Sequence, residues 1–250
     1  MEERLILDEN KYITYKNVKN GSDYKFDLVY FHGLYSSISS NKCKFFESFC
    51  KENGIHFIAL NYLGHGTSSG KVEDFTTTDW LENIKNIIDK CSKKDLIFLG
   101  SSMGSWLSCL TALNYEKRIK GIVGISSAID YLTESVEPKV KKNDFDKDII
   151  LKTPDKEGNL NNNITKKLWL DGKKYSLLTK ETIGLECPIR LIHGMKDTLI
   201  DYKIPLKFIE KVKSKNSKIT LIKDADHYMK RQSDLEVIVN NLVEVINLLI

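Results

Sequence analysis

The sequence predicts an α/β protein with a mostly parallel central sheet, helices on both of its faces and one small insertion. From about Phe26 to the C-terminus, short apolar runs alternate with amphipathic stretches, a pattern typical of parallel strands covered by helices. A chain of 250 residues can bury one sizeable core, so we expect a single domain over residues 1–250. The alternation is lost over residues 130–186, which we interpret as an inserted cap.

The first half of the chain opens with an edge strand. Residues 11–16 have the composition of such a strand, and the apolar run at 28–31 predicts a buried one. Residues 42–52 carry three phenylalanines at helical spacing, and Asn-Gly follows as a helix end. A further strand is expected at 55–61, before a glycine-rich loop. Residues 77–91 predict an amphipathic helix with tryptophan, leucine and isoleucine on its inner face.

The second half continues this alternation on either side of the insertion. The remaining strands are expected at 96–99, 119–126, 189–193 and 219–222, and the remaining helices at 102–114, 202–212 and 234–250. Between them, residues 130–186 are rich in lysine, aspartate and asparagine but still hold many large apolar side chains. A disordered linker does not carry so many, so we expect this cap to pack its apolar side against another part of the molecule.

Composition excludes several classes of function. The 38 basic and 34 acidic residues give a net charge of +4 and are interleaved, so we expect no nucleic-acid partner. Five scattered cysteines without a Cys-x-x-Cys pair indicate neither a disulfide framework nor a zinc site. No run approaches the roughly 20 apolar residues of a membrane span, and the N-terminus is too acidic for a transit peptide. We therefore expect a cytoplasmic protein in a reducing compartment, without stable membrane insertion.

The most informative motif follows the apolar run at residues 96–99. Gly100 and Gly104 flank Ser102 in a Gly-x-Ser-x-Gly pentapeptide, and a helical segment begins at once. A strand, a sharp turn and a helix in this order are the context of a nucleophile elbow, which lifts the serine hydroxyl clear of the sheet. The two glycines let neighbouring backbone approach closely. By itself, the pentapeptide fits a serine-capped helix start equally well.

Partners for this serine are available further along the chain. A serine hydroxyl is a good nucleophile only beside a base, and the base needs a third group to orient it. His227 follows the last expected strand and Asp197 follows the strand before it, so both lie at the carboxyl edge of the sheet. Asp130, after an earlier strand, is the alternative acid. Serine, acid and histidine at one edge predict nucleophilic catalysis by Ser102.

Four other histidines have weaker claims to be the base. His56 begins a strand and His193 directly precedes a glycine at a strand end, so we interpret both as packing residues. His32 and His65 lie in loops at the carboxyl edge, but both precede Ser102 in the chain. We therefore expect these two to line the pocket.

Four stretches of the sequence carry a family resemblance. They are NYLGHGTS at 61–68, GSSMGSWL at 100–107, LWLDG at 168–172 and CPIRLIHGMKD at 187–197. With these motifs the chain resembles the α/β-hydrolase superfamily over nearly its whole length. More narrowly, it is similar to the branch that contains the mitochondrial palmitoyl-protein thioesterase and its bacterial relatives. It departs from the mitochondrial member in its asparagine- and lysine-rich cap, and we expect no targeting segment.

This resemblance implies the fold and the site. It implies an α/β-hydrolase fold and a catalytic triad of Ser102, Asp197 and His227, with no metal or organic cofactor. In this architecture the backbone N–H groups of Met103 and Leu34 bind the oxygen that becomes negative during acyl transfer. The implied substrate is a small molecule or another acylated substrate that carries an ester or a thioester.

The sequence therefore predicts a serine hydrolase that cleaves acyl thioesters or carboxylic esters through an acyl-serine intermediate. Besides the triad, we expect His32, Tyr35 and Trp169 to contact the substrate. A short-chain carboxylesterase of broad tolerance is the alternative enzyme. The non-enzymatic alternative is a ligand-binding protein of the same fold that does not catalyse a reaction.

Overall fold

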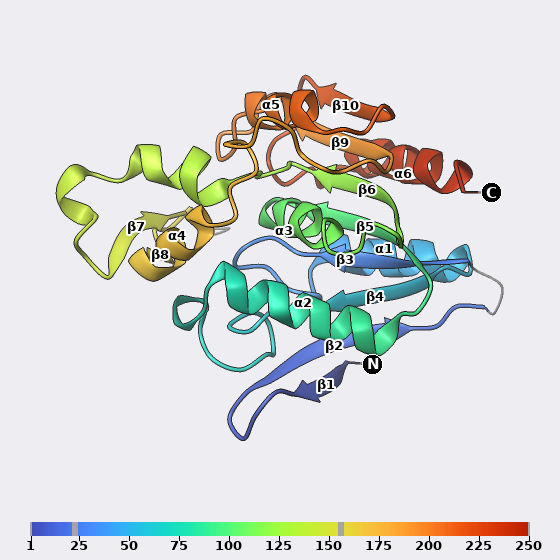
Figure 1. Ribbon diagram of the computed structural model, residues 1–250, viewed down its shortest axis with the longest axis horizontal. Coiled ribbons are helices and arrows are strands. Elements are labelled where there is room, and N and C mark those ends of the chain that lie inside the picture. The colour runs from blue at the N-terminus through green and yellow to red at the C-terminus, as the bar shows by residue number, and fades with distance from the viewer. Residues whose placement is uncertain (1, 22–24, 155–157, 250) are drawn as a thin grey trace.

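A mostly parallel sheet organises the described part of the chain, residues 2–21, 25–154 and 158–249 of a computed structural model (Figure 1). Its eight strands follow the order β1-β2-β4-β3-β5-β6-β9-β10. β2 pairs in antiparallel fashion with both of its neighbours, β1 and β4, and all other neighbours pair in parallel. The predicted fold class is confirmed.

The expected strands and helices are all found, most with ends shifted by one or two residues. The strands of the sheet are β1 (Glu3–Ile6), β2 (Tyr12–Val18), β3 (Phe26–Phe31), β4 (His56–Leu60), β5 (Asp95–Ser101), β6 (Ile119–Ile125), β9 (Ile189–Gly194) and β10 (Ser217–Ile222). The helices that flank it are α1 (Asn41–Glu52), α2 (Thr77–Cys91), α3 (Met103–Ala112), α5 (Lys203–Lys211) and α6 (Gln232–Asn247).

Helices cover both faces of this sheet, as the sequence predicts. α1 and α6 pack on one face, where Phe46 and Leu242 belong to one buried apolar cluster. α2, α3 and α5 pack on the other face, where Trp80, Trp106 and Phe208 belong to a second cluster. Both layers are visible in Figure 1, with α2 and α3 in front of the strands. The two apolar clusters fix the sheet and hold the loops at its carboxyl edge in place.

The N-terminal edge of the sheet differs from the prediction. The edge strand expected at residues 11–16 corresponds to β2, which lies inside the sheet between β1 and β4. β1 begins with Glu3 and Arg4 and is mostly exposed, so its sequence has no apolar alternation that would indicate a strand. Backbone pairing with β2 forms it instead, together with the Tyr15 hydroxyl, which donates to Glu3 Oε2 over 2.8 Å.

Residues 130–186, here called the inserted segment, follow β6 and lie to the left of the sheet in Figure 1. They form the antiparallel pair β7 (Ile149–Thr153) and β8 (Asn162–Thr165), helix α4 (Lys166–Lys173) and three short helical turns, η2 (Tyr131–Val136), η3 (Glu137–Lys139) and η4 (Lys142–Asp144). Residues 155–157 of the expected cap lie outside the described residues.

Several hydrogen bonds fasten the inserted segment to the rest of the molecule, and two of them lie near the carboxyl edge of the sheet. The backbone N–H of Thr78 at the start of α2 donates to Asp171 Oδ2 over 2.8 Å. The Tyr35 hydroxyl donates to the backbone oxygen of Asn163 over 2.7 Å. The segment is therefore attached on both α2 and the loop after β3, close to the carboxyl edge of the sheet.

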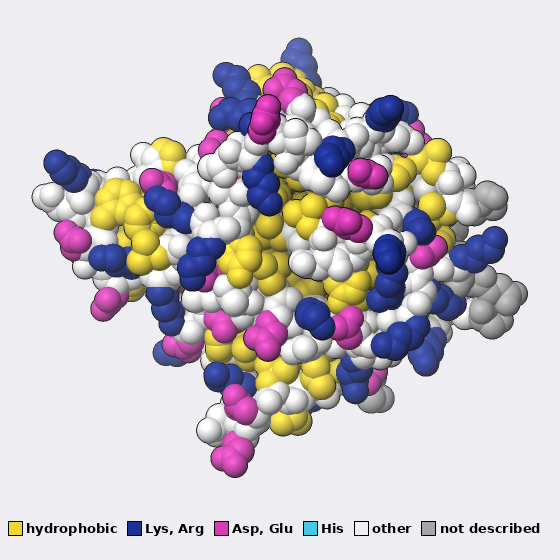
Figure 2. Space-filling model, viewed as in Figure 1, with side chains coloured by type: hydrophobic (Ala, Val, Ile, Leu, Met, Phe, Trp, Pro, Cys, Tyr) yellow, Lys and Arg dark blue, Asp and Glu magenta, His cyan; other side chains and the backbone are white. Residues whose placement is uncertain are grey.

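The surface shows no large area of one charge on the face seen in Figure 2, where basic and acidic side chains are interspersed. This agrees with the interleaved charges of the sequence. In the described ranges, no helix has the length and the apolar character to cross a membrane.

Candidate active site

Ser102 lies at a sharp turn between β5 and α3, with backbone angles φ 56° and ψ −125°. Such a conformation costs roughly 1–3 kcal/mol in a residue other than glycine. The turn depends on its two glycines. A β-carbon on Gly104 would lie 2.2 Å from the backbone oxygen of Phe31, and one on Gly100 would lie 2.5 Å from that of Gly104. The strand, turn and helix that the pentapeptide predicts are therefore present.

The fold brings Ser102, His227 and Asp197 together from distant parts of the chain. His227 Nε2 lies 3.1 Å from Ser102 Oγ, and His227 Nδ1 lies 2.7 Å from Asp197 Oδ2. A carboxylate oxygen only accepts hydrogen bonds, so Nδ1 carries the hydrogen and Nε2 is left to accept from the serine hydroxyl. This arrangement allows a proton to move from the serine to the histidine.

Four donors surround the Asp197 carboxylate, whose side chain is fully buried. Oδ1 accepts from the backbone N–H groups of Leu199 and Ile200, each over 2.9 Å. Oδ2 accepts from His227 and lies 3.0 Å from His193 Nε2, which also lies 3.2 Å from the backbone oxygen of Ile200. Burial by itself would raise the pKa of Asp197, but hydrogen bonds from the two histidines outweigh it and hold this pKa well below its usual range. His193 thus does more than pack at a strand end.

The loop that carries His227 is fixed in three ways. The buried Ser126 hydroxyl donates to the backbone oxygen of His227 over 2.8 Å. Asp226 Oδ1 accepts from the two backbone N–H groups that follow His227, over 2.9 and 3.0 Å, which closes a turn around the histidine. A β-carbon on Gly194 would lie 2.2 Å from the backbone of this loop. Glycine at the end of β9 therefore allows the acid loop and the histidine loop to meet.

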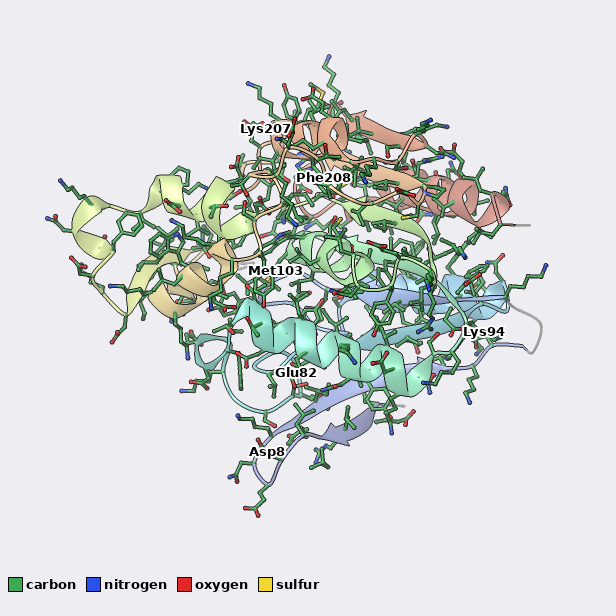
Figure 3. All side chains as sticks on the ribbon, in the orientation of Figure 1. Asp8, Glu82, Lys94, Met103, Lys207 and Phe208 are labelled. Carbon is green, nitrogen blue, oxygen red and sulfur yellow. The ribbon has the colours of Figure 1, made fainter. Side chains whose placement is uncertain are left out.

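A cavity of about 790 Å³ opens at Ser102 and His227. Leu34, Tyr35 and Met103, which the sequence analysis expected around the substrate, all line it. Figure 3 labels Met103 at the start of α3. The loop after β3 runs directly beside the elbow: a β-carbon added to Gly33 would lie 3.2 Å from the β-carbon of Ser102. The two residues expected to supply backbone donors are thus both at the serine.

Two histidines expected to line the pocket are buried behind it instead. His32 has no exposed surface; its Nδ1 lies 2.8 Å from the backbone oxygen of Gly33, and its ring centroid lies 4.2 Å from that of Tyr62. His65 packs edge-on against Trp80 at 5.3 Å. Neither belongs to the described residues that line the cavity. The structure thus places His32, which we expected to contact the substrate, outside the described cavity lining, because ring packing turns this side chain inward.

Trp169, which we also expected to contact the substrate, lies outside the described cavity lining. Its Nε1 donates to Glu137 Oε2 over 2.9 Å, and its ring packs against Phe145 with centroids 5.0 Å apart. The Lys173 ammonium lies 4.5 Å from the ring centroid. These partners all belong to the inserted segment, and they hold the indole ring within it.

The alternative acid, Asp130, has a different set of partners. Its carboxylate accepts from the Ser176 hydroxyl over 2.6 Å and from the backbone N–H groups of Leu177 and Leu178 over 2.9 and 2.7 Å. These bonds join the beginning of the inserted segment to its end. The structure therefore pairs His227 with Asp197 rather than with Asp130.

Four lysines of the cavity lining were not predicted from the sequence: Lys42, Lys139, Lys152 and Lys230. They come from α1, from the inserted segment and from the loop after His227, and no motif joins them in the sequence. Only their convergence in the fold identifies them as a group. Within the ranges that the structure describes, no cluster of three or more histidine, cysteine or acidic side chains is placed to hold a metal ion.

Comparison with known proteins agrees with this architecture. The profile of the alpha/beta hydrolase fold family matches residues 28–160, more than half of the chain. The mitochondrial palmitoyl-protein thioesterase ABHD10 of Homo sapiens is 27% identical over 240 residues, 94% of this chain and 76% of that one.

Solved structures agree as well. Alpha/beta hydrolase domain-containing protein 10 from mouse superposes with a TM-score of 0.89 at 26% identity and covers 100% of both chains. A putative hydrolase from Agrobacterium vitis S4 shares the fold, with a TM-score of 0.90 at 22% identity over 98% of this chain and 97% of that one. With its elbow serine between β5 and α3 and a matching profile over more than half of its length, the chain belongs to the α/β hydrolase fold family.

Proposed function

We propose that this protein is a serine hydrolase that cleaves acyl thioesters or carboxylic esters through an acyl-serine intermediate. The observation that carries the proposal is the hydrogen-bonded chain from Ser102 through His227 to Asp197, at a cavity of about 790 Å³. This volume lies within the range of about 300–1,000 Å³ that small-molecule sites occupy. The name of the human relative, a palmitoyl-protein thioesterase, supports a thioester of a long acyl chain as the substrate.

In the first half of the reaction, Ser102 Oγ attacks the carbonyl carbon while His227 Nε2 takes its proton. The oxygen that becomes negative is bound by the backbone N–H groups of Met103 and Leu34. Donors of this kind are typically worth about 2.7–4 kcal/mol each in the transition state. The tetrahedral intermediate then expels the thiol or alcohol, which takes the proton from His227. An acyl group remains bonded to the serine oxygen.

In the second half, His227 Nε2 removes a proton from water, and the water oxygen attacks the acyl-serine carbonyl. The carboxylic acid leaves as Ser102 Oγ regains its proton from His227. Asp197 keeps the Nδ1 hydrogen in place and stabilises the imidazolium that forms in each half. Because Asp197 also accepts from His193 and two backbone groups, it cannot rotate away from His227 without losing them.

The inserted segment acts in this proposal as a cap over the acyl chain. It contributes Tyr131, Val136 and Leu151 to the cavity lining, and Leu199 and Ile200 of the acid loop lie on the same lining. Together these side chains form an apolar wall on which an acyl chain can be removed from water. Residues 1–250 would then form one domain, with the cap at 130–186 inserted into it.

The test compares the protein with its Ser102→Ala variant on a palmitoyl thioester and on a short-chain ester. We expect Ser102→Ala to lower kcat by about 10⁴-fold or more, since the nucleophile itself is removed, and to abolish labelling by a fluorophosphonate. Ser108→Ala is the matched control, because this serine lies on α3 with its hydroxyl bonded to a backbone oxygen and outside the cavity lining. Unchanged hydrolysis in a folded Ser102→Ala protein would refute the mechanism.

Chain length separates the enzymatic alternatives. A rate that rises from short to long acyl chains supports the thioesterase function, whereas a rate that is flat or falls beyond about four carbons supports a short-chain carboxylesterase. If neither ester is cleaved and the serine is not labelled, the non-catalytic binding protein replaces both.

A further inference from the structure

The cavity at Ser102 is lined by four lysines and, among the described lining residues, by no aspartate or glutamate. The whole chain has nearly equal numbers of acidic and basic residues. On the face seen in Figure 2 both kinds are interspersed. The cavity lining therefore departs from the rest of the molecule by being positively charged only.

Lys42 is the most buried of these lysines and bonds to the residue that precedes Ser102. It projects from the first turn of α1, is half-buried, and donates from Nζ to Ser101 Oγ over 3.2 Å. Ser101 directly precedes Ser102, and both serines line the same cavity as Lys42. Burial lowers the pKa of Lys42 to about 8, against the opposing charges of Asp226 and Asp234. The amine is thus still mostly protonated at neutral pH.

Lys230 lines the cavity from the loop that carries His227. It follows His227 by three residues, is exposed, and lines the same cavity as Lys42. Neither lysine forms an ion pair with a carboxylate of the described chain, whereas lysines such as Lys85 and Lys207 do. Asp226 and Asp234 act on the Lys42 ammonium group without forming an ion pair with it, so a ligand anion that contacts this group stabilises it further.

The positions of the two lysines indicate which part of a substrate they meet. The apolar side chains of the lining come mainly from the inserted segment and the acid loop, which suits the acyl chain. Lys42 and Lys230 instead come from α1 and the histidine loop. His227 is the group that gives its proton to the leaving thiol or alcohol, so a charge near its loop meets the leaving group.

We propose that the leaving group of the substrate carries an anionic substituent, a carboxylate or a phosphate, and that Lys42 and Lys230 bind it. This inference rests on the proposed hydrolysis at Ser102 and adds the chemical class of the leaving group to it. Lys139 and Lys152, at the rim of the cavity, add positive potential that draws an anionic substrate in. The reaction is otherwise unchanged, with water consumed and an acid and a thiol or alcohol released.

The test uses three thioesters that share an octanoyl chain and differ in the thiol. N-acetylcysteamine provides a neutral leaving group, 3-mercaptopropionate a carboxylate and 4′-phosphopantetheine a phosphate. We expect kcat/KM to be about tenfold higher for at least one anionic thioester than for the neutral one, the size of one charge-assisted hydrogen bond. The preference should shrink at high salt, because exposed charges are screened. Which anionic thioester is preferred identifies the carboxylate or the phosphate.

Variants assign the preference to the lysines. Lys42→Gln and Lys230→Gln should each lower the ratio of anionic to neutral kcat/KM severalfold, and the exposed Lys230 can be replaced without disturbing the core. Lys44→Gln is the matched control on the same helix, exposed and outside the cavity lining, and should keep the ratio of the unaltered protein.

Two results distinguish a failure of this inference from a failure of the proposed function. Equal hydrolysis of all three thioesters that still depends on Ser102 overturns the anionic leaving group and leaves the serine hydrolase standing. Hydrolysis that does not depend on Ser102, or none at all, overturns both. A preference that survives in both lysine variants overturns the assignment to Lys42 and Lys230.

Discussion

Replacing Asp197 by asparagine is the sharpest perturbation that the site offers. The carboxylate accepts four hydrogen bonds, two at Oδ1 from backbone N–H groups and two at Oδ2 from His193 and His227. An asparagine has one oxygen and one NH2 group. Whichever way the amide is turned, its NH2 group faces two donors, and two of the four bonds are lost.

The magnitude follows from these four bonds. A buried donor left without its partner costs about 1–3 kcal/mol. His193 Nε2 keeps the backbone oxygen of Ile200 at 3.2 Å, so Asp197→Asn should lower the free energy of unfolding by about 1–6 kcal/mol. If the NH2 group faces the histidines, His227 must place its hydrogen on Nε2, and it can no longer accept the proton of Ser102. We then expect kcat to fall by about 10⁴-fold.

The assay combines urea unfolding with thioester hydrolysis, for Asp197→Asn and for Asp226→Asn as the matched control. Asp226 accepts both of its backbone hydrogen bonds at a single oxygen, which asparagine retains. The control should therefore change stability by less than about 0.5 kcal/mol. An Asp197→Asn variant within about 1 kcal/mol of the unaltered protein refutes the reasoning about stability. A kcat within tenfold shows that the NH2 group does not face His227.

The pH dependence of the same variant supplies a second check. The pKa of Asp197 is held below its usual range in the folded protein, so its contribution to stability is complete above the ordinary value of about 4. It is lost as pH falls from there through the lower folded value. The difference in unfolding free energy between the two proteins should thus be constant near neutrality and shrink below about pH 4.

The remaining predictions concern the elbow and a buried histidine. Gly104→Ala would place a β-carbon 2.2 Å from the Phe31 backbone oxygen, so we expect the free energy of unfolding to fall by about 3 kcal/mol. Gly184→Ala is the control, because its β-carbon would lie 3.8 Å from the nearest atom, and it should change the free energy of unfolding by less than about 1 kcal/mol. If urea unfolding gave the same loss of stability for both variants, the argument from close contact would be contradicted. Burial lowers the pKa of His65 from 6.5 to about 4. As pH falls, His65 is therefore protonated in the unfolded chain before it is protonated in the folded protein. This difference should lower the free energy of unfolding by about 3 kcal/mol between pH 6.5 and pH 4. His65→Gln should show a shallower loss in acid, and a curve parallel to that of the unaltered protein would show that other groups are responsible.

The sequence by itself determined the features that depend on residues close together in the chain. Helix α2 appears at the residues that its periodicity predicts, 77–91, and the elbow at Ser102 has the turn that its two glycines allow. Local spacing is enough to predict these elements, because an apolar helix face or a tight turn depends on residues only a few positions apart. β1 lacked such a signal, since its pairing with β2, rather than its own composition, makes it a strand.

Only the tertiary structure decided which side chains meet. The choice of Asp197 over Asp130 depends on where the inserted segment folds back, because Ser176 and its neighbours bind Asp130 from 46 to 48 residues away. His32 and Trp169 looked equally suitable in the sequence, yet packing turned both away from the cavity. The lysines of the lining converge from three parts of the chain, and Ser102 meets His227 across 125 residues. Such contacts depend on how the loops pack at the carboxyl edge of the folded sheet, and no local sequence pattern predicts that packing.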